Sequence, residues 1–212
     1  MLFRRFRAAT LAALLVTFAE LVGLASTNAG FDPPQLYLTW QRDPTTTMTI
    51  HWLTVGAAAS AAHFRQRGEA DWKTTSGTSH PLPATDRLVH TVELTGLVAG
   101  TNYEFCFAPG EKTFPFRTMP RDLRSPLRFV EGGDVYHGRE WMDAMNQLAA
   151  KFDPAFVVIG GDLAYSMRDT NATESVSRWF DYFDSWKRNA VTPDGRLIPM
   201  LVTLGNHEVA SY

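Results

Sequence analysis

Three places in the chain combine an apolar run, a glycine and residues that can bind a metal ion. They are Glu131-Gly132-Gly133-Asp134, Gly160-Gly161-Asp162 and Gly205-Asn206-His207-Glu208. Each one alone could be an ordinary turn or helix cap. Unpaired carboxylates gathered in one place are costly unless a cation neutralises them, and three such stretches in one half of the chain favour a metal site.

The segments around these stretches predict how the candidate ligands are brought together. Apolar runs at 127–130, 156–159 and 198–204 read as strands, and apolar residues at helical spacing lie between them. The first helical stripe is Trp141, Met145, Leu148 and Phe152, and the second is Val176, Trp179, Phe180, Phe183 and Trp186. The order β-α-β-α-β predicts a parallel sheet covered on both faces. Its carboxyl edge would then hold Asp134, Asp162 and Asn206 side by side.

The first half of the chain, from residue 30 to about 120, has a different pattern. Apolar and polar residues alternate with period two, as in Leu36, Leu38 and Trp40, and turn residues separate the runs. Short strands at regular spacing predict an all-β sandwich. The stretch from Leu94 to Tyr103 resembles the tyrosine corner of fibronectin type III domains, in which a Tyr hydroxyl bonds to upstream backbone.

The N-terminal segment has the features of a signal for secretion. Three arginines, an apolar run and small residues follow one another in the first 29 positions, the order of a secretory signal peptide. A buried or amphipathic helix is the alternative for this segment.

The net charge is -2 and the chain has one cysteine, Cys106. Neither a nucleic-acid surface nor a zinc–thiolate cluster is therefore expected, and any metal would use oxygen and nitrogen ligands. The Asn171-Ala172-Thr173 glycosylation pattern is too short to carry weight alone.

The motifs resemble those of the purple acid phosphatases, within the calcineurin-like metallophosphoesterase superfamily. Gly161-Asp162-Leu163-Ala164-Tyr165 is similar to that family's Gly-Asp-x-x-Tyr motif. Gly205-Asn206-His207-Glu208 is similar to its Gly-Asn-His-Asp/Glu motif, and Asp134 lies where its first motif has an aspartate. The sandwich resembles the domain that precedes the catalytic domain in many members. After the signal peptide at 1–29, the resemblance implies a fibronectin III-like domain at 30–120 and an incomplete αββα-type catalytic domain at 126–212.

The resemblance also implies a role for each candidate residue. Asp162 would bridge two metal ions, and Asp134 with Tyr165 would bind the first, ferric iron. Asn206 would bind the second ion, Fe(II), Zn(II) or Mn(II). His207 would stabilise the substrate phosphate or protonate the leaving alkoxide. The two ions would supply a metal-bound hydroxide at low pH for the hydrolysis of phosphate monoesters.

Two departures from the family pattern stand out. The family's first motif is Asp-x-Gly, whereas Asp134 is followed by Val135-Tyr136-His137-Gly138. Tyr136 or His137 could reach the metals, line the substrate pocket or simply pack. The family's later Val-x-x-His and Gly-His-x-His motifs do not occur in the 212 residues. The expectation is a fragment of a longer enzyme that lacks three histidine ligands and is inactive by itself.

Other functions remain open from the sequence. The same residues would serve a nucleotidase or phosphodiesterase of the superfamily. A third possibility is a secreted binding or adhesion protein with an inactive phosphatase-like domain. The expected partner is a small phosphorylated substrate. The expected location is secreted or periplasmic, with no membrane span once the signal is cleaved.

Overall fold

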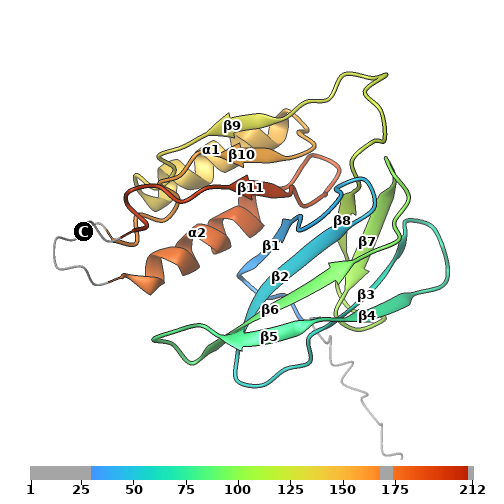
Figure 1. The fold of residues 1–212 in the computed structure, drawn as a ribbon, viewed down its shortest axis with the longest axis horizontal. Helices are drawn as coiled ribbons and strands as arrows, with labels where there is room; N and C mark the ends of the chain where they lie inside the picture. Colours follow the sequence, from blue (N-terminus) through green and yellow to red (C-terminus); the bar gives the residue numbers. More distant parts are fainter. Residues whose placement is uncertain (1–29, 168–173, 210–212) are drawn as a thin grey trace, which may run out of the picture.

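The structure is a computed structural model that describes residues 30–167 and 174–209. The predicted signal peptide at 1–29 and the 171–173 glycosylation pattern lie outside the described residues. The described chain forms a β-sandwich followed by a smaller α/β unit, which lie side by side (Figure 1).

Two four-stranded antiparallel sheets make up the sandwich. One has the order β1-β2-β6-β5 and the other β4-β3-β7-β8. The strands are β1 Leu36–Thr39, β2 Met48–Val55, β3 Ala61–Gln66, β4 Lys73–Ser76, β5 Thr78–Pro81, β6 Arg87–Leu94, β7 Asn102–Cys106 and β8 Phe114–Arg117. The all-β prediction for this half is confirmed, although the polar strands β3, β4 and β5 were not identified from the sequence.

Alternating residues from both sheets form the sandwich core. Leu36, Leu38 and Ile50 from one sheet meet Phe105 and Phe116 from the other, all 0% exposed. Every second residue points inward, which is the period-two pattern expected of strands with one buried face.

Two tight features fix the sandwich's connections. The Tyr103 hydroxyl accepts a 3.0 Å hydrogen bond from the Val98 amide, so the predicted tyrosine corner is confirmed. The chain crosses from β4 to β5 at Gly77. A Cβ there would come within 1.9 Å of the Thr91 carbonyl oxygen, so only glycine fits.

The α/β unit contains a three-stranded parallel sheet in the order β11-β10-β9. Its elements are β9 Val130–Gly132, α1 Arg139–Lys151, β10 Val157–Ile159, α2 Val176–Asn189 and β11 Met200–Val202. The alternation of strands and helices predicted from the sequence is therefore present, with strands of three residues each.

In the described chain, both helices cover the same face of this sheet, so the predicted cover of both faces is not seen in these residues. Val157, Ile159 and Met200 are buried with residues of α1 and α2, whereas Leu201 is 41% exposed. The helices also contact each other, since the Asn146 amide donates to the Ser185 hydroxyl at 3.1 Å. The reason is topological: two right-handed crossovers that step in the same direction along a sheet place their helices on one side.

Helix α1 leaves most of its predicted apolar stripe exposed. Trp141, Met145, Leu148 and Phe152 are 75%, 42%, 57% and 54% exposed. The residues that α1 buries are Met142, Asn146 and Ala150. The periodicity predicted the helix correctly, although its most apolar stripe is not the face that the helix buries.

Helix α2 joins the unit to the sandwich. The Phe183 ring stacks on Tyr37 of β1, with centroids 4.1 Å apart. The Arg87 guanidinium lies 4.2 Å from the centroid of the Phe180 ring. The aromatic residues of α2 thus serve packing between the two parts of the chain.

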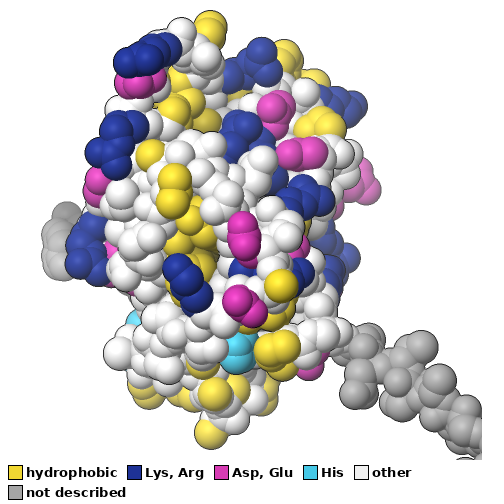
Figure 2. Space-filling view, turned by 90° about the vertical axis from the view of Figure 1, so that its right-hand side faces the viewer, with side chains coloured by type: hydrophobic (Ala, Val, Ile, Leu, Met, Phe, Trp, Pro, Cys, Tyr) yellow, Lys and Arg dark blue, Asp and Glu magenta, His cyan; other side chains and the backbone are white. Residues whose placement is uncertain are grey.

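Charges on the surface are mixed in sign. Figure 2 shows acidic and basic side chains interspersed over one face of the molecule, consistent with the small net charge. Among the helices of the described residues, none has the length and apolar character needed to cross a membrane.

Candidate metal centre

The three strand-end stretches meet at one edge of the parallel sheet, where the backbone links the first two directly. The Asp134 amide donates to the Gly161 carbonyl at 3.3 Å, and the Val135 amide donates to the Asp162 carbonyl at 2.8 Å. Since β9 and β10 are parallel neighbours, both leave the sheet at the same end.

The second and third stretches are also hydrogen-bonded to each other. The His207 amide donates to Asp162 Oδ1 at 3.0 Å, and the Met167 amide donates to the His207 carbonyl at 2.9 Å. The structure therefore places Asp134, Asp162 and His207 in one connected set of loops.

Tyr165 completes this set through its side chain. Its hydroxyl donates to Asp134 Oδ1 at 2.8 Å, and its ring stacks on His207 with centroids 4.3 Å apart. Its ring is buried, at 9% exposed. One phenol thus contacts both a carboxylate and an imidazole, and the three groups follow three different strands.

Glycine permits the close approach of these loops. A Cβ on Gly205 would lie 2.1 Å from Asp162 Oδ1, and one on Gly161 would lie 2.8 Å from the Gly205 Cα. Real Cβ atoms do not come this close, so the carboxylate of Asp162 occupies space that any other residue at 205 would fill.

Backbone strain is concentrated at the candidate ligands. Asp134, Asp162 and Tyr165 have φ of 53°, 52° and 54°, in the left-handed region. Among the described residues, Ala84 and Asp153 are the other non-glycine residues with positive φ. Aspartate tolerates this conformation, but a bulky tyrosine in it is unusual. Such conformations persist only where the surroundings enforce them, and they cluster at functional sites.

Burial and the groups around Tyr165 raise the pKa of its phenol. Burial, the hydrogen bond to Asp134 and the negative charges of Asp134, Asp162 and Glu208 bring it to about 12. The phenol is therefore a neutral donor in the protein alone. A metal cation would act in the opposite sense, because a nearby positive charge favours the phenolate.

Three further residues that the sequence analysis considered lie at or near these loops. Asn206 is exposed in the turn that also carries His207. Tyr136 faces α2: its hydroxyl donates to Asp181 at 3.3 Å and the Arg178 guanidinium lies 4.2 Å from its ring centroid. His137 is exposed, with its ring centroid 6.0 Å from that of Tyr165, so it is nearer to the candidate site.

The donor set has the chemistry of a hard cation site. In the described ranges, no group of three His, Cys, Asp or Glu side chains comes together that could hold a metal ion. The candidate set therefore depends on Tyr165 and Asn206 as additional ligands beside Asp134 and Asp162. Their donors are oxygens of carboxylate, phenol and amide, and two of these are already 2.8 Å apart. Oxygen donors suit Fe(III), Mn(II) and similar hard ions.

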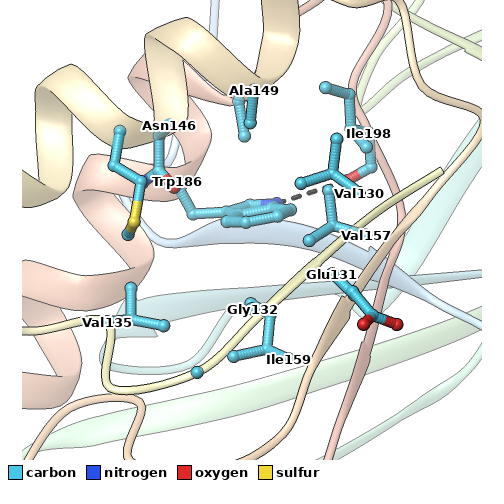
Figure 3. Close-up of a pocket in the computed structure, with 13 residues that line it drawn as sticks. Val130, Glu131, Gly132, Val135, Asn146, Ala149, Val157, Ile159, Trp186 and Ile198 are labelled. Atoms are coloured by element: carbon cyan, nitrogen blue, oxygen red, sulfur yellow. Dashed lines mark hydrogen bonds between the residues drawn. The ribbon is translucent and has the colours of Figure 1, made fainter.

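A separate apolar cavity of about 100 Å³ lies between α1 and the sheet (Figure 3). Its lining includes Val130, Val157 and Ile159 but none of the five candidate residues. The polar groups of Asn146 and Trp186 are already hydrogen-bonded within the protein, to Ser185 and to the Ile198 carbonyl. We interpret it as a packing gap, because no polar group is directed into it to orient a ligand.

The described chain has two parts: an all-β sandwich, and an α/β unit whose strand-end loops bring Asp134, Tyr165 and His207 together. Residues 33–118, which span all eight sandwich strands, match the family model described as "Purple acid Phosphatase, N-terminal domain". The first region of the chain is therefore similar to the N-terminal domain of the purple acid phosphatases, whereas the motifs at 161–165 and 205–208 lie outside the matched residues. No curated protein matches the chain.

Sequence reasoning assigned no role to one acidic residue of the site. Glu208 was recognised only as the last letter of its motif, yet its carboxylate accepts hydrogen bonds from three backbone amides. A carboxylate shortly after a strand end and next to His207 was the available signal. The distant partners of that carboxylate could not be read from the sequence.

Proposed function

We propose that the full-length protein is a secreted or periplasmic acid phosphatase that hydrolyses phosphate monoesters with two metal ions. In this proposal residues 1–29 are a signal peptide, 30–120 the fibronectin III-like domain and 126–212 the first part of the catalytic domain. The observation that carries it is the strained Tyr165, whose hydroxyl lies 2.8 Å from Asp134 in loops that also hold Asp162 and His207.

The residues would hold the metals as the family resemblance implies. Asp134 and Tyr165 would bind one ion, Asn206 the other, and Asp162 both. The first ion would be Fe(III), and the second Fe(II), Zn(II) or Mn(II). When bound, the ions would lower the pKa of a coordinated water and neutralise charge on the phosphoryl oxygens. The remaining histidine ligands would come from outside these 212 residues.

His207 is the proton donor in this proposal. Its ring is half-buried against Tyr165, and its amide is tied to Asp162, so the imidazole has a fixed position beside the ligands. An imidazole there can hydrogen-bond a substrate phosphate or protonate a leaving alkoxide. The substrate is a small phosphate ester.

Metal analysis of purified variants tests the proposal. We expect Asp162→Ala to lose both ions and activity, because a bridging ligand serves two sites. Asn206→Ala should lose mainly one ion. Tyr165→Phe should reduce the visible absorption that a phenolate bound to Fe(III) gives. An Asp162→Ala protein with unchanged metal content would exclude the proposed role of Asp162. A wild type that is colourless, free of iron and fully active would exclude the iron-containing purple type of enzyme, but not a metal-dependent phosphatase.

A further inference from the structure

Glu208 links the two loops that carry most of the candidate ligands. Its Oε1 accepts hydrogen bonds from the amides of Ala164 at 3.1 Å and Tyr165 at 3.0 Å. Its Oε2 accepts from the Gly205 amide at 3.0 Å. The first two amides follow strand β10 and the third follows β11, so one carboxylate holds two strand ends together.

These contacts are stronger than ordinary backbone contacts. A hydrogen bond to an ionised carboxylate is about twice as strong as a neutral one. Glu208 is half-buried, and within the described residues it has no ion pair with Lys, Arg or His. Its charge is therefore directed at the three amides.

The amide of Tyr165 is the important partner, because Tyr165 is the most strained of the candidate ligands. Its φ of 54° requires support from its surroundings. Glu208 bonds the backbone of this residue and of the residue before it. The phenol oxygen depends on that backbone for its 2.8 Å contact with Asp134.

We propose that Glu208 is a positioning residue: it holds the left-handed turn that directs Tyr165 at Asp134, and locks that turn to the loop of Asn206 and His207. As a part of the metal centre this role rests on the proposed function. As a statement about the loops it concerns the metal-free protein and can be tested there.

The first test measures hydrogen exchange of the metal-free chain, in peptides that cover 163–166 and 204–206. Glu208→Gln keeps the shape of the side chain but replaces one acceptor oxygen with a donor and removes the charge. We expect exchange in both peptides to rise by about tenfold, since loss of one such bond is worth a factor of this size. Glu208→Asp, which keeps the charge on a shorter side chain, should show a smaller rise. Glu140→Gln, at an exposed position of α1, is the matched control and should change neither peptide.

The second test follows the visible absorption band of the iron-loaded full-length protein. We expect Glu208→Gln to shift or weaken the band while Tyr165 is still present, and Glu208→Asp to restore part of it. Unchanged exchange in the two peptides, or exchange that rises equally everywhere, would overturn the proposal. A selective rise in exchange with an unaltered band would also overturn it, because Tyr165 would then be held by other contacts. If the wild type binds no iron but the selective rise is seen, the proposed function fails while the role of Glu208 in the loops stands.

Discussion

The sandwich and the α/β unit differ in how completely they cover their apolar residues. In the sandwich, strands from two sheets face each other, and Trp52, Phe105 and Phe116 are at most 1% exposed. In the α/β unit, the sheet has helices on one face, and Trp141 and Leu148 of α1 are more than half exposed. The sandwich satisfies its apolar faces with its own strands, whereas the described α/β unit does not.

The two regions also differ in backbone strain. Among the described residues of the sandwich, Ala84 is the one non-glycine residue with positive φ. The α/β unit has four, and three of them are candidate ligands. A region selected for stability avoids such conformations, and a region that must fix reactive groups accepts them. The strained backbone therefore coincides with the candidate site in the second region, and the sandwich has almost none of it.

The largest effect is expected from a cavity in the sandwich core. Phe105 is 0% exposed and packs against Phe114, with ring centroids 5.2 Å apart. We expect Phe105→Ala to lower the free energy of unfolding of the sandwich by about 3–5 kcal/mol. Urea unfolding followed by fluorescence measures this, with the exposed Val98→Ala as the control. A loss below about 1 kcal/mol would mean that this core is not the main source of stability.

A smaller change in the free energy of unfolding is expected when the pH is lowered, because of a histidine at the junction of the two regions. Burial and the nearby His80 lower the pKa of His51 from 6.5 to about 4. His51 bonds to Thr39 and Thr91 and stacks on Tyr37, which in turn stacks on Phe183 of α2.

The lowered pKa of His51 determines how the stability of the folded protein changes with pH. The neutral imidazole is favoured in the folded protein, so its contribution is fully present above pH 6.5 and is lost as the pH falls towards 4. The loss should be on the order of 1–3 kcal/mol, since the ring is only partly covered. His51→Gln should flatten this part of the stability–pH curve. A wild-type curve that is level between pH 6.5 and 4 would show that the ring is charged without cost.

The sequence predicted the order of the elements and the place of the site better than the way in which elements pack. Glycine followed by Asp134, Asp162 or Asn206 after each apolar run was sufficient to predict one shared edge, because parallel topology brings strand ends together. Strands β4 and β5 were missed because their polar residues, such as Lys73 and Thr75, lack apolar alternation, and β3 was missed although Ala62 and Phe64 alternate in it. Pairing with a neighbouring strand stabilises them instead.

Contacts between residues far apart in the sequence could not be predicted, for a different reason. The direction in which α1 presents its apolar stripe depends on where α2 lies, and both depend on the crossover geometry. Two of the three amides that bond Glu208 lie 43 and 44 residues before it in the sequence, and the third lies in its own turn. Local pattern carries no information about such partners.

The smallest effect on stability is expected from the apolar stripe of α1, although its effect on association should be clear. Leu148 is 57% exposed in the middle of the stripe formed by Trp141, Met145 and Phe152. Leu148→Lys removes little buried surface, so the free energy of unfolding should change by no more than about 0.5 kcal/mol. Large exposed apolar patches promote association, so the lysine should reduce both self-association and binding of a hydrophobic dye.

The control for this variant must separate charge from apolar surface. Glu140→Gln changes the net charge by the same +1 but leaves the stripe intact, so it should behave as the wild type in dye fluorescence and sedimentation velocity. If both variants reduce dye binding equally, net charge is the cause and the stripe is not a sticky surface. If Leu148→Lys instead costs several kcal/mol, then Leu148 is buried in solution. The contrast between a closed sandwich and an open α/β unit would then not hold at α1.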